Sequence, residues 1–323
     1  MESKNKVLTI LRNEVMILIL IALCVVFGIL NPNFLTVKNL LNICTQNAYF
    51  IIATVGIAMI MISGGTDLSV GYAMSVVGVV MAMSMTQAGL PVPVAIIIGL
   101  VLGVALGLFN GFIANLLTIH PMIVTLATMT MYQGISYTVS GSKSFFNFPA
   151  EFTGIGQGYV GAISIPIILF VIIVVVFSFI MSKTCFGRFV YAVGGNPEAA
   201  HLAGINVKRV KLLVFAISGA LFGLASIVLV SRGGSANSTI GPGTEFDGIT
   251  ACVLGGVSFI GGAGKIRGAM VGCLILGVLS NGMQLAGMGV YTQYIVKGAI
   301  LIASIGFDTI QQNAKTKVKK AAA

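Results

Sequence analysis

The sequence predicts an all-α protein, a polytopic bundle of about ten transmembrane helices that forms a single domain over residues 1–323. Two observations carry this prediction. Hydrophobic residues make up 57% of the chain and charged residues only 8%, whereas a soluble domain contains roughly 25% charged residues. The charge-free intervals are also long, and residues 68–142 contain no Asp, Glu, Lys or Arg. A surface so poor in charge suits lipid rather than water.

The placement of the spans follows from the charge-free intervals and the helix breakers inside them. A spanning helix needs about 20 mostly apolar residues, and Gly and Pro divide the longer intervals. We place the spans at residues 15–31, 44–64, 69–86, 94–117, 121–140, 162–182, 212–231, 248–264, 268–286 and 291–307. The eighth is short and rich in glycine, and the tenth contains Lys297, so these two fit the pattern least well.

The basic residues predict the orientation, because cytoplasmic loops carry an excess of Lys and Arg. With the N-terminus inside, the outside segments contain only Lys38, Lys143 and Arg232. The inside segments contain Lys4, Lys6, Arg12, Lys183, Arg188, Lys208, Arg209, Lys211, Lys265, Arg267, Lys315, Lys317, Lys319 and Lys320. Both termini are therefore expected in the cytoplasm. Because the basic residues follow loop position and no basic–aromatic pattern occurs, a nucleic-acid partner is not expected.

Signatures of catalysis, metal binding and nucleotide binding are missing from the sequence. The five cysteines are scattered and form no C-x-x-C pair, so neither a disulfide framework nor a metal site is implied. The two histidines, His120 and His201, are far apart, and we interpret His120 as a satisfied loop residue. Gly264-Lys265 does not complete a phosphate loop, because Phe259 and Ile266 occupy the positions that need Gly and Ser or Thr. No catalytic residue and no cofactor are predicted.

Glycines recur at helical spacing and predict close helix packing. Gly99, Gly103, Gly107 and Gly111 line one face of the fourth span, and Gly219 and Gly223 do the same in the seventh. Small residues allow helices in lipid to approach closely. The pair Gly64-Gly65 is also echoed by Gly261-Gly262, which leaves an internal repeat, of the inverted kind found in many transporters, as an open alternative.

The main inside loop, residues 183–211, contains signals for a short surface helix. Asn196 is a good N-cap, Pro197 suits the first helical position, and Glu198 complements the positive helix end. Ala199, Ala200 and His201 continue the helix, and Gly204 supplies a left-handed stop. Such a helix of about seven residues would be roughly 10 Å long. Together with Gly194 and Gly195 it forms a small projection suited to a groove on a cytosolic partner, although a structured loop without a partner is the alternative.

A second distinctive segment, residues 62–71, lies at the inside end of the second span. Gly64-Gly65 break the helix, and Asp67 is the only acid between Glu14 and Glu151. Non-helical backbone at this depth must be buried in protein or line a cavity. Asp67 is interpreted first as a cap for the next helix near the membrane interface and second as a gate, with Gly71 following it.

At these segments the sequence resembles the inner-membrane permeases of carbohydrate ABC importers of the ribose type. The resemblance lies in GGTDLSVG at residues 64–71, AVGGNPEAAHLAGI at 192–205 and LGGVSFIGGAG at 254–264, and their order and spacing match over nearly the whole chain. Thr66 stands where this family usually has Ile, and His201 where Arg is common. The implied fold is a helical permease in the bacterial cell (inner) membrane.

The resemblance also implies partners and roles. It implies an importer of two permease subunits, either two copies or two related chains, with two cytosolic ABC ATPase domains and an extracytoplasmic sugar-binding protein. ATP would be used by the partner subunit and not by this chain. Residues 196–204 would be the coupling helix that docks on the ATPase, with Gly194 and Gly195 before it, and the solute would be a ribose-like monosaccharide.

Polar side chains within the spans are candidates for the translocation pathway, since they are costly in lipid unless used or paired. They are Asn47, Asn110, Asn115, Gln133, Asn281 and Gln284. Hydrogen bonding between helices is the alternative role for each. For the whole chain, the alternative function is a secondary transporter or channel that works alone, for which Lys297 is the only internal charged candidate. The third class considered is a membrane-embedded enzyme, and the sequence lacks the catalytic residues that it would need.

Overall fold

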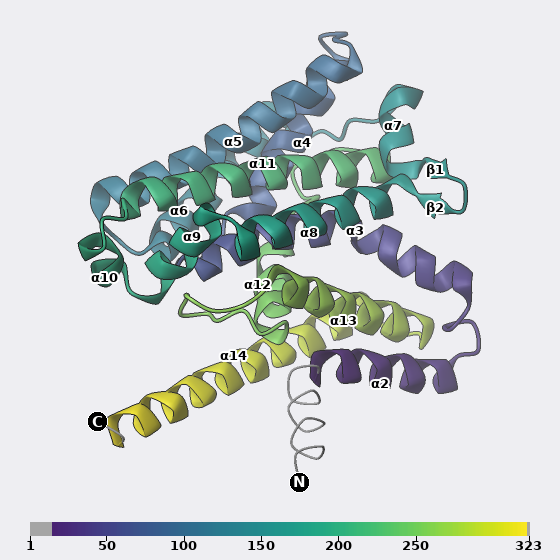
Figure 1. Ribbon diagram of the computed structural model, residues 1–323. Helices are drawn as coiled ribbons and strands as arrows, with labels where there is room; N and C mark the ends of the chain where they lie inside the picture. The colour runs from purple at the N-terminus through teal and green to yellow at the C-terminus, as the bar shows by residue number, and fades with distance from the viewer. Residues whose placement is uncertain (1–14, 322–323) are drawn as a thin grey trace.

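The computed structural model describes residues 15–321, and thirteen helices and one hairpin account for most of this range (Figure 1). The elements are α2 Val15–Leu30, α3 Val37–Ile62, α4 Val70–Thr86, α5 Val92–Leu117, α6 Pro121–Ser140, α7 Ala150–Gln157, β1 Tyr159–Val160, β2 Ile163–Ser164, α8 Ile165–Lys183, α9 Cys185–Gly195, α10 Pro197–Leu202, α11 Val207–Gly233, α12 Thr244–Leu254, α13 Ile266–Leu285 and α14 Val290–Ala321. The predicted inside residues Lys4, Lys6 and Arg12 lie outside the described range, as do the side chains of the basic tail at 315–320.

The prediction of a mostly helical, polytopic membrane protein is confirmed. Five of the described helices are long and apolar enough to cross a membrane, namely α3, α5, α8, α11 and α13. Shorter apolar helices occupy Met16–Leu30, Val70–Thr86 and Val290–Gly306. The count of ten spans is not confirmed, and the cytoplasmic side of both termini stays a prediction.

Two details of the predicted fold are wrong. The eighth predicted span, 248–264, is not one helix: α12 has 11 residues and ends at Leu254, so its length is about 16 Å, too short for a hydrocarbon core of about 30 Å. Gly255 ends the helix and Gly256 has a φ of +77°, so the chain continues as a glycine-rich loop. The fold is also not strictly all-α, because β1 and β2 form a small antiparallel hairpin before α8.

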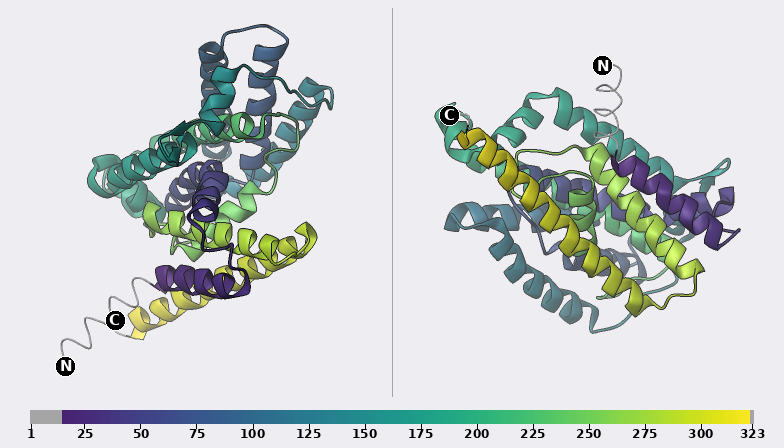
Figure 2. Two further views of the ribbon diagram at one scale, coloured as in Figure 1. Left: turned by 90° about the vertical axis from the view of Figure 1, so that its right-hand side faces the viewer. Right: turned by 90° about the horizontal axis from the view of Figure 1, so that it is seen from below.

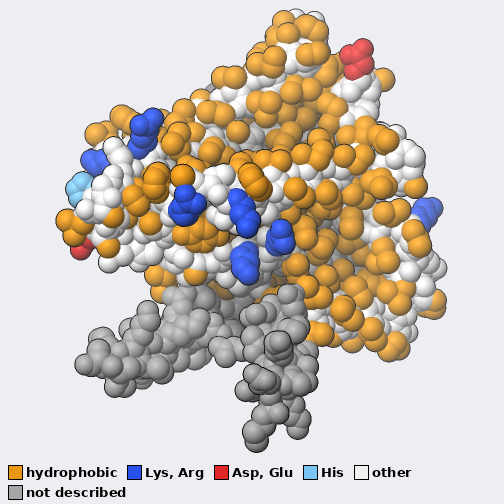
Figure 3. Space-filling view, in the orientation of Figure 1, with side chains coloured by type: hydrophobic (Ala, Val, Ile, Leu, Met, Phe, Trp, Pro, Cys, Tyr) orange, Lys and Arg blue, Asp and Glu red, His pale blue; other side chains and the backbone are white. Residues whose placement is uncertain are grey.

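Helix α3 is the centre of the bundle, and every residue from 50 to 63 is buried. It packs against α8, α11, α12 and α13. In Figures 1 and 2, α2 and α14 form an outer layer beyond α13, on the side away from α5 and α6. The protein core therefore surrounds α3, whereas the outer helices expose apolar side chains over much of the surface (Figure 3).

The close packing predicted for the glycine faces of α5 and α11 is confirmed, and the structure shows that the two faces meet each other. A Cβ atom on Gly103 would overlap the carbonyl oxygen of Gly219, and one on Gly107 would lie 3.0 Å from the Cα of Gly219. The backbones of α5 and α11 therefore approach closely enough to exclude any side chain between them. Packing of this kind replaces the apolar driving force that helices lack in lipid.

After α11 the chain folds back into the bundle before α12 begins. Phe145 and Ala236 form an isolated β-bridge near the start of this segment. Further along, the Gly241 N–H donates to Ser75 Oγ of α4 at 3.2 Å. The segment 234–243 thus descends from the end of α11 to the first turns of α4, and α12 starts inside the protein rather than at its surface.

The two ends of the bundle differ. Figure 1 places α10 and the C-terminal end of α14 at one end, and α7 with the β-hairpin at the other. On the face drawn in Figure 3, most basic side chains lie toward the end that carries α10. This distribution agrees with the orientation expected from the basic residues, with α10 on the cytoplasmic side.

Candidate functional site

The predicted surface helix forms as α10, with six residues from Pro197 to Leu202. Asn196 is its N-cap, and its Oδ1 accepts a hydrogen bond from the Ala199 N–H at 3.0 Å. Gly204 has a φ of +81°, the left-handed conformation expected of a helix stop. The local structure predicted from sequence is confirmed here, because its signals depend only on neighbouring residues.

Leu202 is the residue of this helix that sequence reasoning missed. Within α10 only Ala200 is buried, and Leu202 is 88% exposed. The prediction from sequence named the small residues of this helix, whereas in the structure a large apolar side chain is exposed at the end of the projection.

All three segments singled out in the sequence meet behind α10. The Gly262 N–H donates to the carbonyl oxygen of Ile62 at 2.9 Å. A Cβ on Gly194, near the end of α9, would overlap that same oxygen and would lie 2.7 Å from the Gly262 nitrogen. Gly64, at φ +82°, packs against Gly194 and Gly261. We call this contact of residues 62–64, 194–195 and 261–262 the glycine junction.

The glycine junction explains the echo between Gly64-Gly65 and Gly261-Gly262. The two pairs lie side by side and contact each other. Both pairs pack backbone against backbone, and only glycine allows so close an approach.

Asp67 is fully buried in the protein and belongs to a polar network. Its Oδ1 accepts hydrogen bonds from the Ser69 N–H at 2.8 Å and from Ser69 Oγ at 2.7 Å. Asn110 Nδ2 donates to Ser69 Oγ at 2.8 Å, and the Tyr132 hydroxyl donates to Asn110 Oδ1 at 3.1 Å. Asp67 thus orders the turn before α4 and ties it to α5 and α6.

Glu245, in the first turn of α12, is a second buried acid that the sequence prediction placed in an outside loop. It is 1% exposed, and its Oε1 accepts a hydrogen bond from the Gly243 N–H at 3.0 Å. Its other oxygen faces Gly71 at the start of α4, and a Cβ there would overlap it. Gly71 is therefore needed for the close approach of α12 and the 234–243 segment to α4.

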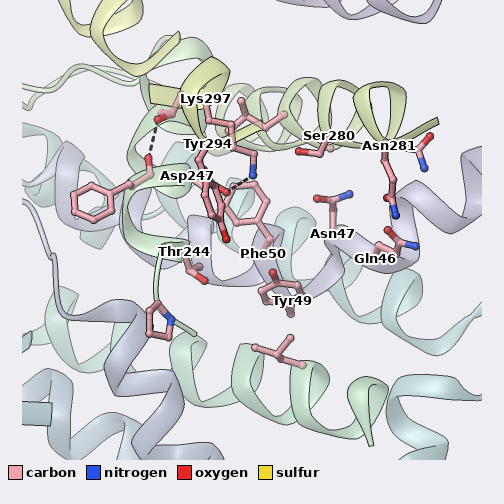
Figure 4. Close-up of a pocket in the computed structure, with 18 of the residues that line it drawn as sticks. Gln46, Asn47, Tyr49, Phe50, Thr244, Asp247, Ser280, Asn281, Tyr294 and Lys297 are labelled. Carbon is pink, nitrogen blue, oxygen red and sulfur yellow. Dashed lines mark hydrogen bonds and ion pairs between the residues drawn. The ribbon is translucent and has the colours of Figure 1, made fainter. Parts of the chain in front are cut away.

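A cavity of about 610 Å³ opens between α3, α12, α13 and α14 (Figure 4). Its amide groups come from α3 and α13, which supply Gln46, Asn47, Asn281 and Gln284, and its hydroxyl groups include those of Ser280 on α13 and of Thr244 and Thr250 on α12. Tyr49, Phe50, Phe246 and Tyr294 supply aromatic surface. The cavity lies between the central helix α3 and the outer helix α14, and we call it the polar pocket.

One ion pair lies in the polar pocket. Lys297 Nζ is 2.7 Å from Asp247 Oδ2, and the two side chains are 21% and 32% exposed. The pair joins α12 to α14. Lys297, noted from sequence as the charge a stand-alone transporter would need, is thus already paired in this conformation.

The six predicted pathway residues separate into two groups. Asn47, Asn281 and Gln284 line the polar pocket, although Asn281 also exchanges hydrogen bonds with Asn39 at 2.9 and 3.2 Å. Asn110 belongs to the Asp67 network, and Asn115 Nδ2 donates to the Lys208 carbonyl at 2.8 Å. Gln133 is half-buried on α6, away from the pocket. The sequence alone could not separate the two groups, because both consist of polar side chains in apolar helices and the sequence does not show which of them face the pocket.

His120 is satisfied, as interpreted from sequence. It is the N-cap of α6, and its Nδ1 accepts a hydrogen bond from the Met122 N–H at 3.3 Å. Partial burial, and to a lesser degree the charge of Lys211, lower the pKa of His120.

The Tyr191 hydroxyl donates to the Gly264 carbonyl at 2.8 Å, and this hydrogen bond holds α9 against the glycine-rich loop.

A helical membrane bundle with a polar pocket on one side of its central helix and an exposed helix at one end is the architecture of a transport protein. Residues 39–305 match the family described as the permease component of the branched-chain amino acid transport system. The chain belongs to this permease family, and its resemblance to ribose-type ABC importer permeases is confirmed. Permease components are transport subunits rather than enzymes, and this is a multi-pass protein of the bacterial cell membrane.

Several curated relatives are similar over nearly their whole length. The galactose/methyl galactoside import permease protein MglC of Escherichia coli (strain K12) is 36% identical, covering 96% of this chain and 97% of the relative. The ribose import permease protein RbsC of Haemophilus influenzae is 37% identical over 91% of each chain. RbsC of Bacillus subtilis (strain 168) is 38% identical over 90% of each. No solved structure matches this chain.

Proposed function

We propose that this chain is the membrane-spanning permease subunit of an ATP-driven importer for a monosaccharide. It would work with a second permease subunit, two cytosolic ABC ATPase domains that use the ATP, and an extracytoplasmic sugar-binding protein. The relatives named above import ribose and galactosides, which supports a sugar as the solute.

The observation that carries the proposal is the connection between α10 and the polar pocket. α10 projects from the bundle with Leu202 exposed, and the glycine junction joins α9 to the end of α3 and to the loop after α12. Both α3 and α12 line the polar pocket. A displacement of α10 by an ATPase would therefore reach two walls of the pocket through backbone contacts that have no flexible side chains between them.

Individual residues have different roles in such a permease. Residues 194–201 and Gly204 form the coupling segment, Gly64, Gly65, Asp67 and Gly71 hold the turn that moves with it, and Asn47, Asn281 and Gln284 contribute to the pathway. The loop that carries α7 and the hairpin would receive the binding protein.

Reconstitution tests the function. The permease is incorporated into proteoliposomes with its ATPase and binding protein, and uptake of radiolabelled D-ribose or D-galactose is measured. We expect uptake that requires ATP, the ATPase and the binding protein. Uptake driven by an ion gradient in liposomes that contain the permease alone would instead establish a stand-alone transporter.

A further inference from the structure

We propose that the polar pocket binds one neutral monosaccharide, and that the Asp247–Lys297 ion pair selects this solute against zwitterionic amino acids. The proposal rests on the function proposed above and adds the site and its selectivity. The question arises because the family is described by amino acid transport whereas the relatives are sugar permeases.

The wall formed by α3 and α13 offers neutral hydrogen-bonding groups. Asn47, Ser280 and Gln284 all line the pocket, and Figure 4 shows Asn47 and Ser280 near each other across it. Amide and hydroxyl side chains both donate and accept, as do the hydroxyl groups of a sugar. These groups provide hydrogen-bond partners without any charge to be balanced by the solute.

Aromatic side chains complement the apolar face of a sugar ring. Tyr49, Phe50 and Tyr294 line the pocket, and Phe50 and Tyr294 lie beside the ion pair in Figure 4. A tyrosine presents an apolar ring and a polar tip, so it can cover the C–H face of a pyranose or furanose while its hydroxyl bonds to the ring substituents. The aromatic surface expected of a sugar site is thus present although the chain contains no Trp.

The ion pair has capacity left for a neutral ligand. The contact at 2.7 Å involves one carboxylate oxygen and one ammonium proton, while an ammonium has three donors and a carboxylate has about four acceptor positions. Neighbouring sugar hydroxyls can bond to both partners and leave the two charges paired. An amino acid brings its own carboxylate and ammonium, and it can bond to both charges only by breaking the 2.7 Å contact that the pair already makes.

Arg232 also lines the polar pocket and carries a third charge. By itself it would favour a carboxylate ligand, so it is the feature that argues most directly for an amino acid. L-Leucine is therefore the competitor that the test must include.

The test measures protection of a cysteine in the pocket. Ser280→Cys is introduced after Cys24, Cys44 and Cys185 are replaced; Cys252 and Cys273 are fully buried. The initial rate of alkylation by N-ethylmaleimide is measured on the purified permease in nanodiscs. We expect D-ribose or D-galactose at about four times its dissociation constant, which occupies one site to about 80%, to slow the reaction about fivefold, and L-leucine to leave the rate unchanged.

Variants identify the ion pair as the selective contact. Asp247→Asn and Lys297→Gln each leave one charge unpaired, so L-leucine should protect the cysteine in both variants, whereas Asp247→Glu and Lys297→Arg, which keep the pair, should exclude leucine as the wild type does. Lys38→Gln removes an exposed charge outside the pocket and is the matched control. Size-exclusion profiles establish that each variant is folded.

Protection by leucine equal to that by sugar when the pair is intact, or failure of leucine to protect the cysteine in Asp247→Asn and Lys297→Gln, would overturn the proposal. Uptake by the assembled wild-type transporter is measured separately. ATP-dependent sugar uptake, with no sugar protecting the cysteine introduced by Ser280→Cys, would refute the pocket assignment and leave the proposed function intact.

Discussion

At the scale of single residues, the most constrained position is Gly194. It lies against the Ile62 carbonyl and the Gly262 nitrogen, which themselves form a hydrogen bond of 2.9 Å. Its neighbour Gly195 has open space where a Cβ would lie. Two adjacent glycines with opposite surroundings provide a matched pair for testing whether the glycine junction transmits motion.

Gly194→Ala should therefore impair transport far more than Gly195→Ala. The added methyl group overlaps backbone atoms, and overpacking of this kind costs about 1–3 kcal/mol, which the junction can relieve only by separating α9 from α3. We expect at least a tenfold lower ratio of sugar imported to ATP hydrolysed, corresponding to about 1.4 kcal/mol, measured in proteoliposomes. Equal ratios for the two variants would show that the junction plays no part in coupling.

The protonation of His120 should make the free energy of unfolding depend on pH. Its Nδ1 must be unprotonated to accept from the Met122 N–H, and its pKa in the folded protein is lowered by burial and by Lys211. A base whose pKa is lower in the folded state binds more protons when unfolded, so stability falls as pH decreases below the ordinary histidine value of about 6.5.

The measurement is the melting temperature of the detergent-solubilised protein between pH 7.5 and pH 5. His120→Asn retains an N-cap acceptor and should flatten the part of this dependence that His120 contributes, and His120→Ala should lose about 1 kcal/mol of stability at pH 7.5. An unchanged pH profile in His120→Asn would be inconsistent with this assignment.

At the scale of elements, Gly204 sets the end of α10. Its φ of +81° is inaccessible to proline, which is held near −65°. Gly204→Pro should therefore misdirect α10 while leaving the membrane helices in place. We expect normal membrane insertion but a large loss of ATPase binding, measured by co-purification. Gly204→Asn, which tolerates the left-handed conformation, is the control and should bind the ATPase nearly as well as the wild type.

What the sequence could predict depends on whether the signal is local. The cap at Asn196 and the stop at Gly204 depend on adjacent residues, and the glycine faces of α5 and α11 depend on the four-residue spacing of glycines within each helix. These predictions require no knowledge of distant contacts, and they are confirmed. The eighth span failed because hydropathy does not distinguish an apolar glycine-rich loop from a helix when protein surrounds both. The Asp247–Lys297 pair, separated by 50 residues, requires knowing which helices are neighbours.

At the scale of the whole molecule, the proposal requires α10 to face the cytosol. Cys185, at the start of α9, is exposed and lies in the same loop as α10. Glu151 on α7 is exposed at the opposite end of the bundle. One native cysteine and one replaceable acid therefore report on the two faces of the membrane without disturbing a buried contact.

Labelling with a membrane-impermeant maleimide fixes the orientation. In intact spheroplasts, we expect no labelling of Cys185 and rapid labelling of Glu151→Cys in a background with Cys185→Ser; after permeabilisation Cys185 should react as well. The basic residues favour this orientation because it places fourteen of them inside. If Cys185 were labelled before permeabilisation, α10 would lie outside, where it could not meet an ATPase that draws on cytosolic ATP, and the force that the glycine junction is proposed to transmit would have no source.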